Sequence, residues 1–250
     1  MEFLLVSLIN SEWTESTTPS IWRINPLIAD NLTIARGDME LCFQVNFTVA
    51  SGQILHIQGS NGIGKTTLLM MLAGLLPILE NRENHQNNKS LSWANAPLSD
   101  WPVLYIGHSM GLNAGLSVRE NLKFLQGINT NSDQQLSFAL GVVGLSGYED
   151  VAISRLSSGQ KRRVSLARLW MTSNLDALWL LDEPFNALDS DMVSRLSERL
   201  AQHAEQGGRI ILTSHQALTL PVQTLDLEQF AVLADDEYSD IATIDREYSH

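Results

Sequence analysis

The chain has 250 residues, 44% of them hydrophobic, and a formal net charge of −12. This length suits one sizeable α/β domain with an inserted subdomain, and the negative charge argues against nucleic acid or an anionic membrane surface as the main partner. The single cysteine, Cys42, excludes an internal disulfide and a cysteine-based metal cluster, which favours a reducing compartment such as the cytosol. No run of about 18 apolar residues occurs, so we expect membrane association only through a partner.

Hydrophobic patterning predicts alternating strands and helices. Short apolar or alternating segments predict strands, which in chain order cover 27–36, 41–49, 54–57, 103–106, 177–181 and 210–213. Segments with an apolar side at helical spacing predict helices, which cover 66–73, 121–125, a segment opened by 132–135, 160–171 and a segment capped by Asp189 that ends at Gly207. Continuous apolar strands such as 177–181 are typical of a parallel sheet covered on both faces.

This order of elements predicts one α/β domain with two extensions. The domain is expected over 27–222, with a helical insertion over about 107–160 between two strands. Residues 1–26 show no sustained period and are expected to be an N-terminal extension, and 223–250 an acidic C-terminal tail. The polar, Asn-rich stretch 80–90 is expected to be a surface loop.

The stretch Gly59-Ser-Asn-Gly-Ile-Gly-Lys-Thr66 joins a predicted strand to a predicted helix and fits the pattern G-x-x-x-x-G-K-[ST]. Its glycines permit the positive φ angles that wrapping a phosphate requires, and the following helix points its N-terminal N–H groups at the anion. Lys65 is expected to reach the β- and γ-phosphates, and the Thr66 hydroxyl to ligate Mg²⁺. The predicted nucleotide-binding residues are Gly59, Ser60, Asn61, Gly62, Ile63, Gly64, Lys65, Thr66 and Thr67.

Two carboxylates, Asp182 and Glu183, follow the apolar strand 177–181. Ligands of open α/β sheets bind at the carboxyl ends of the strands. Asp182 is placed there to hold Mg²⁺ directly or through water, and Glu183 to polarise an attacking water. Adjacent acids at a strand end can also cap the following turn, but a phosphate loop upstream favours the catalytic roles.

The peptide Leu156-Ser-Ser-Gly-Gln160 resembles the signature L-S-G-G-Q of ABC-type ATPases. The motifs of that family follow in order between about Leu27 and Pro221: the phosphate loop, a helical insertion, the signature, Asp182-Glu183, Ala187-Leu188-Asp189 and His215. The resemblance implies a P-loop NTPase fold of the ABC-ATPase type, with a mostly parallel sheet core, an antiparallel β subdomain and an inserted helical subdomain. It also implies ATP hydrolysis with ATP and Mg²⁺ by a homodimer of ATPase subunits.

In that family the signature contacts the γ-phosphate bound by the other subunit, which implies nucleotide contacts for Ser157, Ser158, Gly159 and Gln160. Ser158 replaces the usual glycine, one small residue for another. The resemblance implies that His215 hydrogen-bonds the γ-phosphate and contacts Glu183, so the implied catalytic residues are Glu183, His215 and Lys65. Asp189 would lie at the contact between two subunits, and this role is compatible with capping the helix that follows.

Two positions depart from the family pattern. Ser109 stands where the family has a glutamine that senses Mg²⁺ and water and links them to the membrane partner, and His108 is a possible substitute. Arg36 stands where the family tends to place an aromatic residue under the adenine. A guanidinium can stack on a base, but an exposed arginine is the favoured interpretation.

Longer strings narrow the resemblance. Arg162-Arg-Val-Ser-Leu-Ala-Arg-Leu-Trp170 and Glu205-Gln-Gly-Gly208 are similar to the ATP-binding subunit of the haem exporter of bacterial cytochrome c maturation. That resemblance implies a peripheral subunit on the cytoplasmic face of the bacterial inner membrane, paired with integral membrane permease subunits of that system. There, ATP hydrolysis is linked to release of a haem-loaded chaperone. Direct haem binding is not expected, since structural or surface roles are favoured for Cys42, His56, His85, His203 and His250.

Two functional hypotheses remain open at this point. The first is an ATP-hydrolysing enzyme that drives membrane subunits. The second, motivated by Ser109, is an ATP-gated dimerising module of another ABC permease with weak or no turnover. Glu183 favours the enzyme, because a gated module needs no carboxylate there. A GTPase switch is disfavoured, because Asn88-Lys89-Ser90-Leu91 lacks the aspartate of the N-K-x-D peptide that reads guanine.

Overall fold

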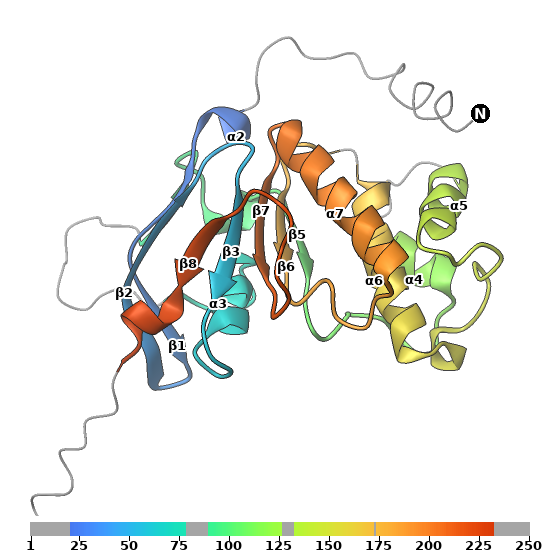
Figure 1. Ribbon diagram of the computed structural model, residues 1–250, viewed down its shortest axis with the longest axis horizontal. Helices are drawn as coiled ribbons and strands as arrows, with labels where there is room; N and C mark the ends of the chain where they lie inside the picture. Colours follow the sequence, from blue (N-terminus) through green and yellow to red (C-terminus); the bar gives the residue numbers. More distant parts are fainter. Residues whose placement is uncertain (1–20, 79–89, 127–132, 173, 233–250) are drawn as a thin grey trace, which may run out of the picture.

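The computed structural model describes residues 21–78, 90–126, 133–172 and 174–232. At its centre lies a five-stranded sheet with the order β5-β6-β7-β3-β8, in which every neighbouring pair is parallel (Figure 1). Its strands are β3 (Ile54–Gln58), β5 (Val103–Ile106), β6 (Leu178–Leu181), β7 (Arg209–Thr213) and β8 (Gln223–Asp226). Because parallel strands end at the same edge, the residues that follow them come together there.

Alternate residues of the central strands point into two separate hydrophobic cores. On one face, Trp179 packs in a core with α6 (Ser158–Met171) and α7 (Ser190–Glu205). On the other face, Leu180 packs in a core with α3 (Lys65–Leu72) and with a second sheet. All four residues of β6 are buried, so this strand has the two-sided cover that its unbroken apolar sequence predicted.

The second sheet is antiparallel and has the order β2-β1-β4. Its strands are β1 (Leu27–Arg36), β2 (Met39–Val49) and β4 (Leu91–Trp93). The predicted turn joins β1 to β2 at Gly37, which has a φ of 63°. Side chains of both strands pack on Gly64, so this sheet lies against the phosphate loop. The expected combination of a mostly parallel core and an antiparallel β subdomain is therefore confirmed.

The inserted helices are α4 (Val118–Gln126) and α5 (Asp133–Val142), which lie with α6 and α7 on the right of Figure 1. Ser117 and Glu120 form the predicted capping box: the Ser117 N–H donates to Glu120 Oε2 at 2.8 Å, and the Glu120 N–H donates to Ser117 Oγ at 3.2 Å. Short 3₁₀ helices cover Leu98–Asp100 (η1), Ile153–Arg155 (η2) and Leu227–Phe230 (η3). None of the helices within the four described ranges is long and apolar enough to cross a bilayer.

The expected boundary between residues 222 and 223 is wrong. β8 pairs in parallel with β3, and η3 follows it beside β2. The Val232 N–H then donates to Leu41 O at 3.0 Å. Residues 223–232 therefore belong to the folded domain, and an acidic tail can begin only after them. The sequence missed β8 because only Leu225 of its four residues is buried, which is typical of a short edge strand.

Residues 21–26, which the sequence assigned to the N-terminal extension, pack on the domain. They contain a short helix, α2 (Ile21–Ile24). The Arg209 side chain donates to Asn25 O at 2.7 Å, and Trp22 meets Trp93 edge to face with ring centroids 4.9 Å apart. Several expected features lie outside the described residues. They are residues 1–20 of the N-terminal extension, all but the last residue of the 80–90 loop, the Ser132 cap and residues 233–250 of the acidic tail.

Candidate nucleotide-binding and hydrolysis site

The phosphate loop runs from the end of β3 to the start of α3, as its motif predicted. Gly59, Gly62 and Gly64 have φ angles of 136°, 89° and 118°, which residues with a side chain rarely adopt. A Cβ on Gly59 would stand 2.9 Å from Ile63, so substitution there would also displace the loop. Gly64 is the N-cap of α3 and offers no side-chain cap, which leaves the first N–H groups of the helix for a ligand such as phosphate.

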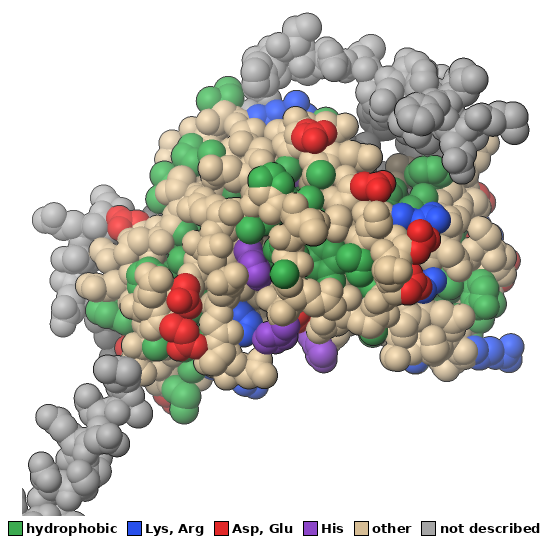
Figure 2. All heavy atoms as spheres, viewed as in Figure 1, with side chains coloured by type: hydrophobic (Ala, Val, Ile, Leu, Met, Phe, Trp, Pro, Cys, Tyr) green, Lys and Arg blue, Asp and Glu red, His purple; other side chains and the backbone are tan. Residues whose placement is uncertain are grey.

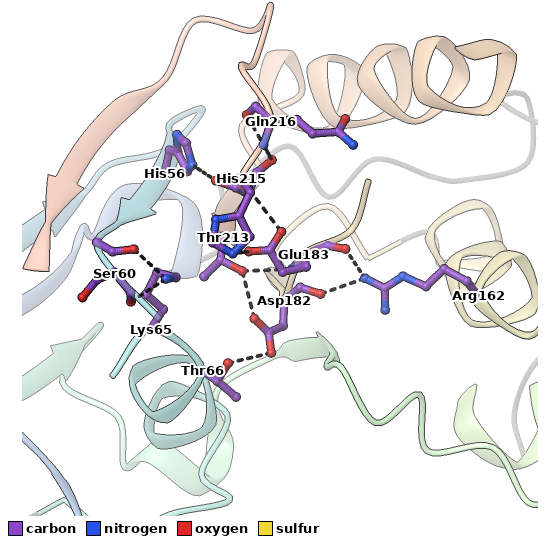
Figure 3. A network of polar contacts seen from close by, with 12 residues as sticks. His56, Ser60, Lys65, Thr66, Arg162, Asp182, Glu183, Thr213, His215 and Gln216 are labelled. Carbon is purple, nitrogen blue, oxygen red and sulfur yellow. Dashed lines mark hydrogen bonds and ion pairs between the residues drawn. The ribbon is translucent and has the colours of Figure 1, made fainter. Parts of the chain in front are cut away.

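Lys65 and Thr66 follow the glycines at the start of α3. The Lys65 ammonium lies over the loop and donates to Gly59 O at 2.7 Å and Ser60 O at 2.9 Å (Figure 3). Thr66 is an exposed residue, and its hydroxyl donates to Asp182 Oδ2 at 2.9 Å. A hydroxyl and a carboxylate oxygen at this separation are hard ligands of the kind that Mg²⁺ takes.

Asp182 and Glu183 directly follow β6, at the edge that also carries the phosphate loop. Asp182 is buried, and its Oδ1 accepts from the Thr213 hydroxyl at 2.9 Å. Glu183 has a positive φ of 50°, and its side chain is 14% exposed. Its Oε2 accepts from the His215 N–H at 3.2 Å. Its buried Oε1 has no hydrogen-bond partner among the residues that the structure describes, and His215 Nε2 lies 3.4 Å from it. An unsatisfied buried carboxylate oxygen is able to accept a bond from a ligand or a water.

Thr213 and Arg162 complete this cluster, and sequence reasoning missed both. The Thr213 hydroxyl accepts from the Glu183 N–H at 2.9 Å while it donates to Asp182. Leu181 of β6 pairs with Leu212 of β7, so the residues that follow them, Asp182 and Thr213, lie beside each other. Arg162, on α6, donates to backbone carbonyls of the same cluster. A threonine that ends a buried strand, directly before Ser214-His215, is the sequence signal that could have found Thr213.

The signature peptide forms the start of α6. The Ser157 hydroxyl accepts from the Gln160 N–H at 3.2 Å, and the Ser157 N–H donates to Gln160 Oε1 at 2.9 Å, which is a capping box. Among the described residues, no hydrogen bond joins the signature to the phosphate loop of the same chain. Ser157 and Ser158 are exposed, so the signature is available to another molecule.

A comparison with family models matches residues 42–186 to the ABC transporter model. The chain belongs to the ABC transporter family. Curated relatives place it in the branch of the cytochrome c biogenesis ATP-binding export proteins CcmA. It is 42% identical to the CcmA of Mannheimia succiniciproducens over 210 residues, which cover 83% of this chain and 96% of that one. It is 44% identical to the Yersinia pseudotuberculosis protein, over 77% of this chain and 87% of that one.

Solved structures agree on the fold. A putative ABC transporter ATP-binding protein from Pyrococcus furiosus matches with a TM-score of 0.67 at 21% identity, over 83% of this chain and all of that one. The ATP-binding subunit of another ABC transporter matches with a TM-score of 0.63 at 23% identity, over 76% of this chain and 79% of that one. The chain is thus an ABC-type ATPase with the expected P-loop NTPase fold.

An open pocket of about 440 Å³ lies beside the phosphate loop of this ABC ATPase. Lys65, His56 and His215 line it, and Figure 2 shows histidine side chains gathered beside a basic side chain on this face. His56 is buried, and its Nε2 lies 3.1 Å from Ser214 O, the residue before His215. His215 itself has an exposed side chain. His56 and His203 both bond to backbone carbonyls, which fits structural roles.

Glu228 is a further carboxylate at the phosphate loop that the sequence did not single out. Its Oε1 accepts from the Ser60 N–H at 2.6 Å. Hydrogen bonds from Ser60 lower the pKa of Glu228 from its ordinary value, and the positive charge of Lys65 adds to this effect. The segment after β8 therefore contacts the loop directly, which is a second reason to include it in the domain.

The two departures from the family pattern, Ser109 and Arg36, both lie on the surface. Ser109 and His108 follow β5 and are both exposed. Arg36 is exposed at the end of β1, in agreement with the favoured interpretation.

Asp189 caps α7 by accepting from the Met192 N–H at 2.9 Å and also forms an ion pair with Arg163 of α6. The Met192 bond is the main reason that the pKa of Asp189 is below its ordinary value.

Proposed function

We propose that this ABC ATPase is the ATP-hydrolysing subunit of a transporter complex for haem export or haem-chaperone release in cytochrome c biogenesis. Support comes from 42% identity over 96% of a curated relative named for cytochrome c biogenesis export. The observation that carries hydrolysis is the buried Glu183 Oε1, which accepts no hydrogen bond from the described residues and faces His215 at the edge that carries the phosphate loop. A module that only binds ATP has no need of this carboxylate.

The phosphate loop and Lys65 bind the triphosphate. The open N–H groups at the start of α3 receive phosphate oxygens, and Gly59, Ser60, Asn61, Gly62, Ile63, Gly64 and Thr67 shape the loop around them. Lys65 exchanges its bonds to Gly59 O and Ser60 O for bonds to the β- and γ-phosphates. This exchange places a positive charge where negative charge develops during hydrolysis.

Thr66 and Asp182 would hold Mg²⁺ in this proposal. Their oxygen atoms lie 2.9 Å apart, and together with phosphate oxygens and water they suit its hard, octahedral coordination. When bound, Mg²⁺ neutralises charge on the β- and γ-phosphate oxygens. Thr213 keeps Asp182 oriented by donating to its other oxygen.

Glu183 activates the attacking water. Its Oε1 accepts a hydrogen bond from the water and takes its proton as the water oxygen attacks the γ-phosphorus, while the bond between the γ-phosphorus and the bridging oxygen of the β-phosphate breaks and ADP leaves. His215 lies 3.4 Å from this oxygen and, being exposed, can turn to the γ-phosphate. The proton leaves Glu183 after the phosphate departs, which restores the carboxylate.

The signature residues Ser157, Ser158, Gly159 and Gln160 act on a second copy of the chain. They are held at the start of α6, where N–H groups can receive a γ-phosphate bound by that copy. Asp189, beside them through its ion pair with Arg163, lies at the same contact. Two sites therefore form between the members of a homodimer.

The partners in this proposal are integral membrane permease subunits of the cytochrome c maturation system, which hold the dimer at the cytoplasmic face of the bacterial inner membrane. The test is to purify the tagged chain from gently solubilised membranes, identify the copurifying proteins and assay ATP hydrolysis by the complex. Copurification with cytochrome c maturation membrane proteins and active hydrolysis are expected. A different permease would overturn the haem assignment, and an ATP-bound complex without turnover would favour an ATP-gated module, the alternative motivated by Ser109.

A further inference from the structure

Arg162 is a buried arginine, 7% exposed, near the start of α6. Its guanidinium reaches the carboxyl ends of β5 and β6, where it donates to three backbone carbonyls. The acceptors are Gly107 O at 3.1 Å, Asp182 O at 2.7 Å and Glu183 O at 2.6 Å, the last two drawn in Figure 3. Burying a charged side chain is costly unless it is bonded, and these carbonyls supply bonds for the two terminal nitrogens, whereas Nε has no hydrogen-bond partner among the described residues. Burial lowers the pKa of Arg162 by more than the negative charge of Asp182 raises it.

The backbone of Glu183 needs such support. Its φ of 50° lies in the left-handed region, which costs a residue with a side chain free energy and persists only where the surroundings enforce it. The Glu183 N–H is bonded to Thr213 Oγ1 at 2.9 Å. Its carbonyl accepts from Arg162 at 2.6 Å and from the Asn186 N–H of its own turn at 3.2 Å. Side chains from β7 and α6 therefore hold both ends of this residue.

We propose that Arg162 is a positioning residue for hydrolysis: by holding the Glu183 carbonyl, it keeps the Glu183 carboxylate aimed at the attacking water. The inference rests on the proposed function, in which Glu183 activates that water. In this proposal Arg162 acts through the Glu183 backbone and contacts neither nucleotide nor water. Its loss is expected to let the Glu183 peptide rotate toward a more common φ, which would turn the carboxylate away.

Arg162 also joins two other parts of the chain to Glu183. α6 begins at the signature, so Arg162 links the start of this helix to Glu183. The same guanidinium holds Gly107, two residues before Ser109, in the segment that leads from β5 toward the inserted helices.

The first measurement compares kcat, KM and nucleotide affinity of the full chain with those of Arg162→Met and Arg162→Lys. We expect Arg162→Met to lower kcat about thirtyfold or more while KM and ATP affinity change less than about threefold. The kcat of Arg162→Lys should lie between those of Arg162→Met and the unchanged chain, because lysine keeps the charge but lacks the planar guanidinium that reaches several carbonyls at once. Arg162→Lys also serves as the test variant if Arg162→Met fails to fold. The control is Arg168→Met, which removes a part-buried arginine of the same helix that donates to Tyr105 O at 3.0 Å.

The second measurement separates positioning from general destabilisation. If Arg162 acts through Glu183, then Arg162→Lys should lower the residual single-turnover rate of Glu183→Gln by less than about twofold. Equal fractional losses in both backgrounds would overturn the positioning role. So would a kcat for the Arg162 variants no lower than that of Arg168→Met. Normal ATP turnover by Glu183→Gln would contradict the proposed role of Glu183. An inactive Glu183→Gln together with fully active Arg162 variants would contradict only the positioning role of Arg162.

Discussion

The phosphate loop and the carboxylate cluster are two halves of one site, and they are built differently. The loop is a single continuous stretch, residues 59–67, whose geometry depends on glycine backbone angles and the start of one helix. The cluster takes residues from α6 and from the ends of β6 and β7, and it depends on the register of those strands. In the proposed function, ATP binding therefore depends on one local segment and hydrolysis on contacts between distant segments, so substitutions in the two halves should have separable effects.

The largest expected effect is in the loop. Lys65→Ala removes the ammonium that the loop holds at Gly59 O and Ser60 O, so we expect ATP affinity to fall about a hundredfold or more and turnover to vanish with it. Equilibrium binding of a fluorescent ATP analogue measures this. Lys123→Ala is the matched control, since Lys123 is a half-exposed lysine of α4 paired with Asp133. Unchanged affinity in Lys65→Ala would contradict the binding role of the loop.

The next effect is in the cluster. Glu183→Gln keeps the size and the Oε1 acceptor of the side chain but not its ability to take a proton, so kcat should fall roughly a hundredfold to a thousandfold. ATP affinity should change less than about threefold, because the role proposed for Glu183 is in hydrolysis and not in binding. A steady-state ATPase assay with a binding titration measures both. Glu198→Gln, on the exposed face of α7, is the control. Near-normal turnover in Glu183→Gln would refute its role as the base.

Thr213 tests whether the halves are really separable, because it holds Asp182 and the Glu183 N–H together. Thr213→Val keeps the shape and leaves both groups without this partner, so we expect kcat to fall about tenfold. Thr213→Ser restores the hydroxyl and should recover most of the activity. Kinetics at varied Mg²⁺ and ATP would measure this. If Thr213→Val raised KM as strongly as it lowered kcat, the two halves would act as one.

The smallest effect should leave both halves untouched. His203 is buried and stacks on Trp179 with ring centroids 3.7 Å apart, and burial lowers its pKa to about 4. The unfolded chain takes up this proton near pH 6.5, so the contribution of His203 is complete above that pH and is lost as pH falls toward 4. We expect roughly 2 kcal/mol of the free energy of unfolding to disappear between about pH 6.5 and pH 5.

The measurement is urea unfolding of the full chain and of His203→Phe across this pH range. The variant keeps an aromatic ring at this position but has no group that takes up a proton, so it should lack this part of the pH dependence. An equal loss of stability in both proteins would show that other groups cause it. Turnover of His203→Phe near neutral pH should match that of the unchanged chain, because His203 bonds to Ala177 O and not to the nucleotide site.

Most of the fold could be predicted from the sequence, because long periodic segments carry their own signal. The strands from β1 to β7 were placed to within a few residues, except β4, whose three residues are too few to show a period. β8 was missed because an edge strand buries too little of its side chains to be recognised. The segment 21–26 was missed because its main anchors, Trp93 and Arg209, are distant in the chain.

By itself the sequence determined the order of the motifs, the positive φ angles of the loop glycines and the residues that bear charge at the site. Each of these depends on neighbours in the chain or on the identity of a side chain. Only the tertiary structure brought Thr213 and Arg162 to Glu183 and Glu228 to Ser60. The physical reason is strand register for Thr213 and Glu228, since hydrogen bonding across the sheet sets which residues of distant strands meet, and the packing of α6 on the sheet for Arg162. No local pattern in the sequence records these pairings.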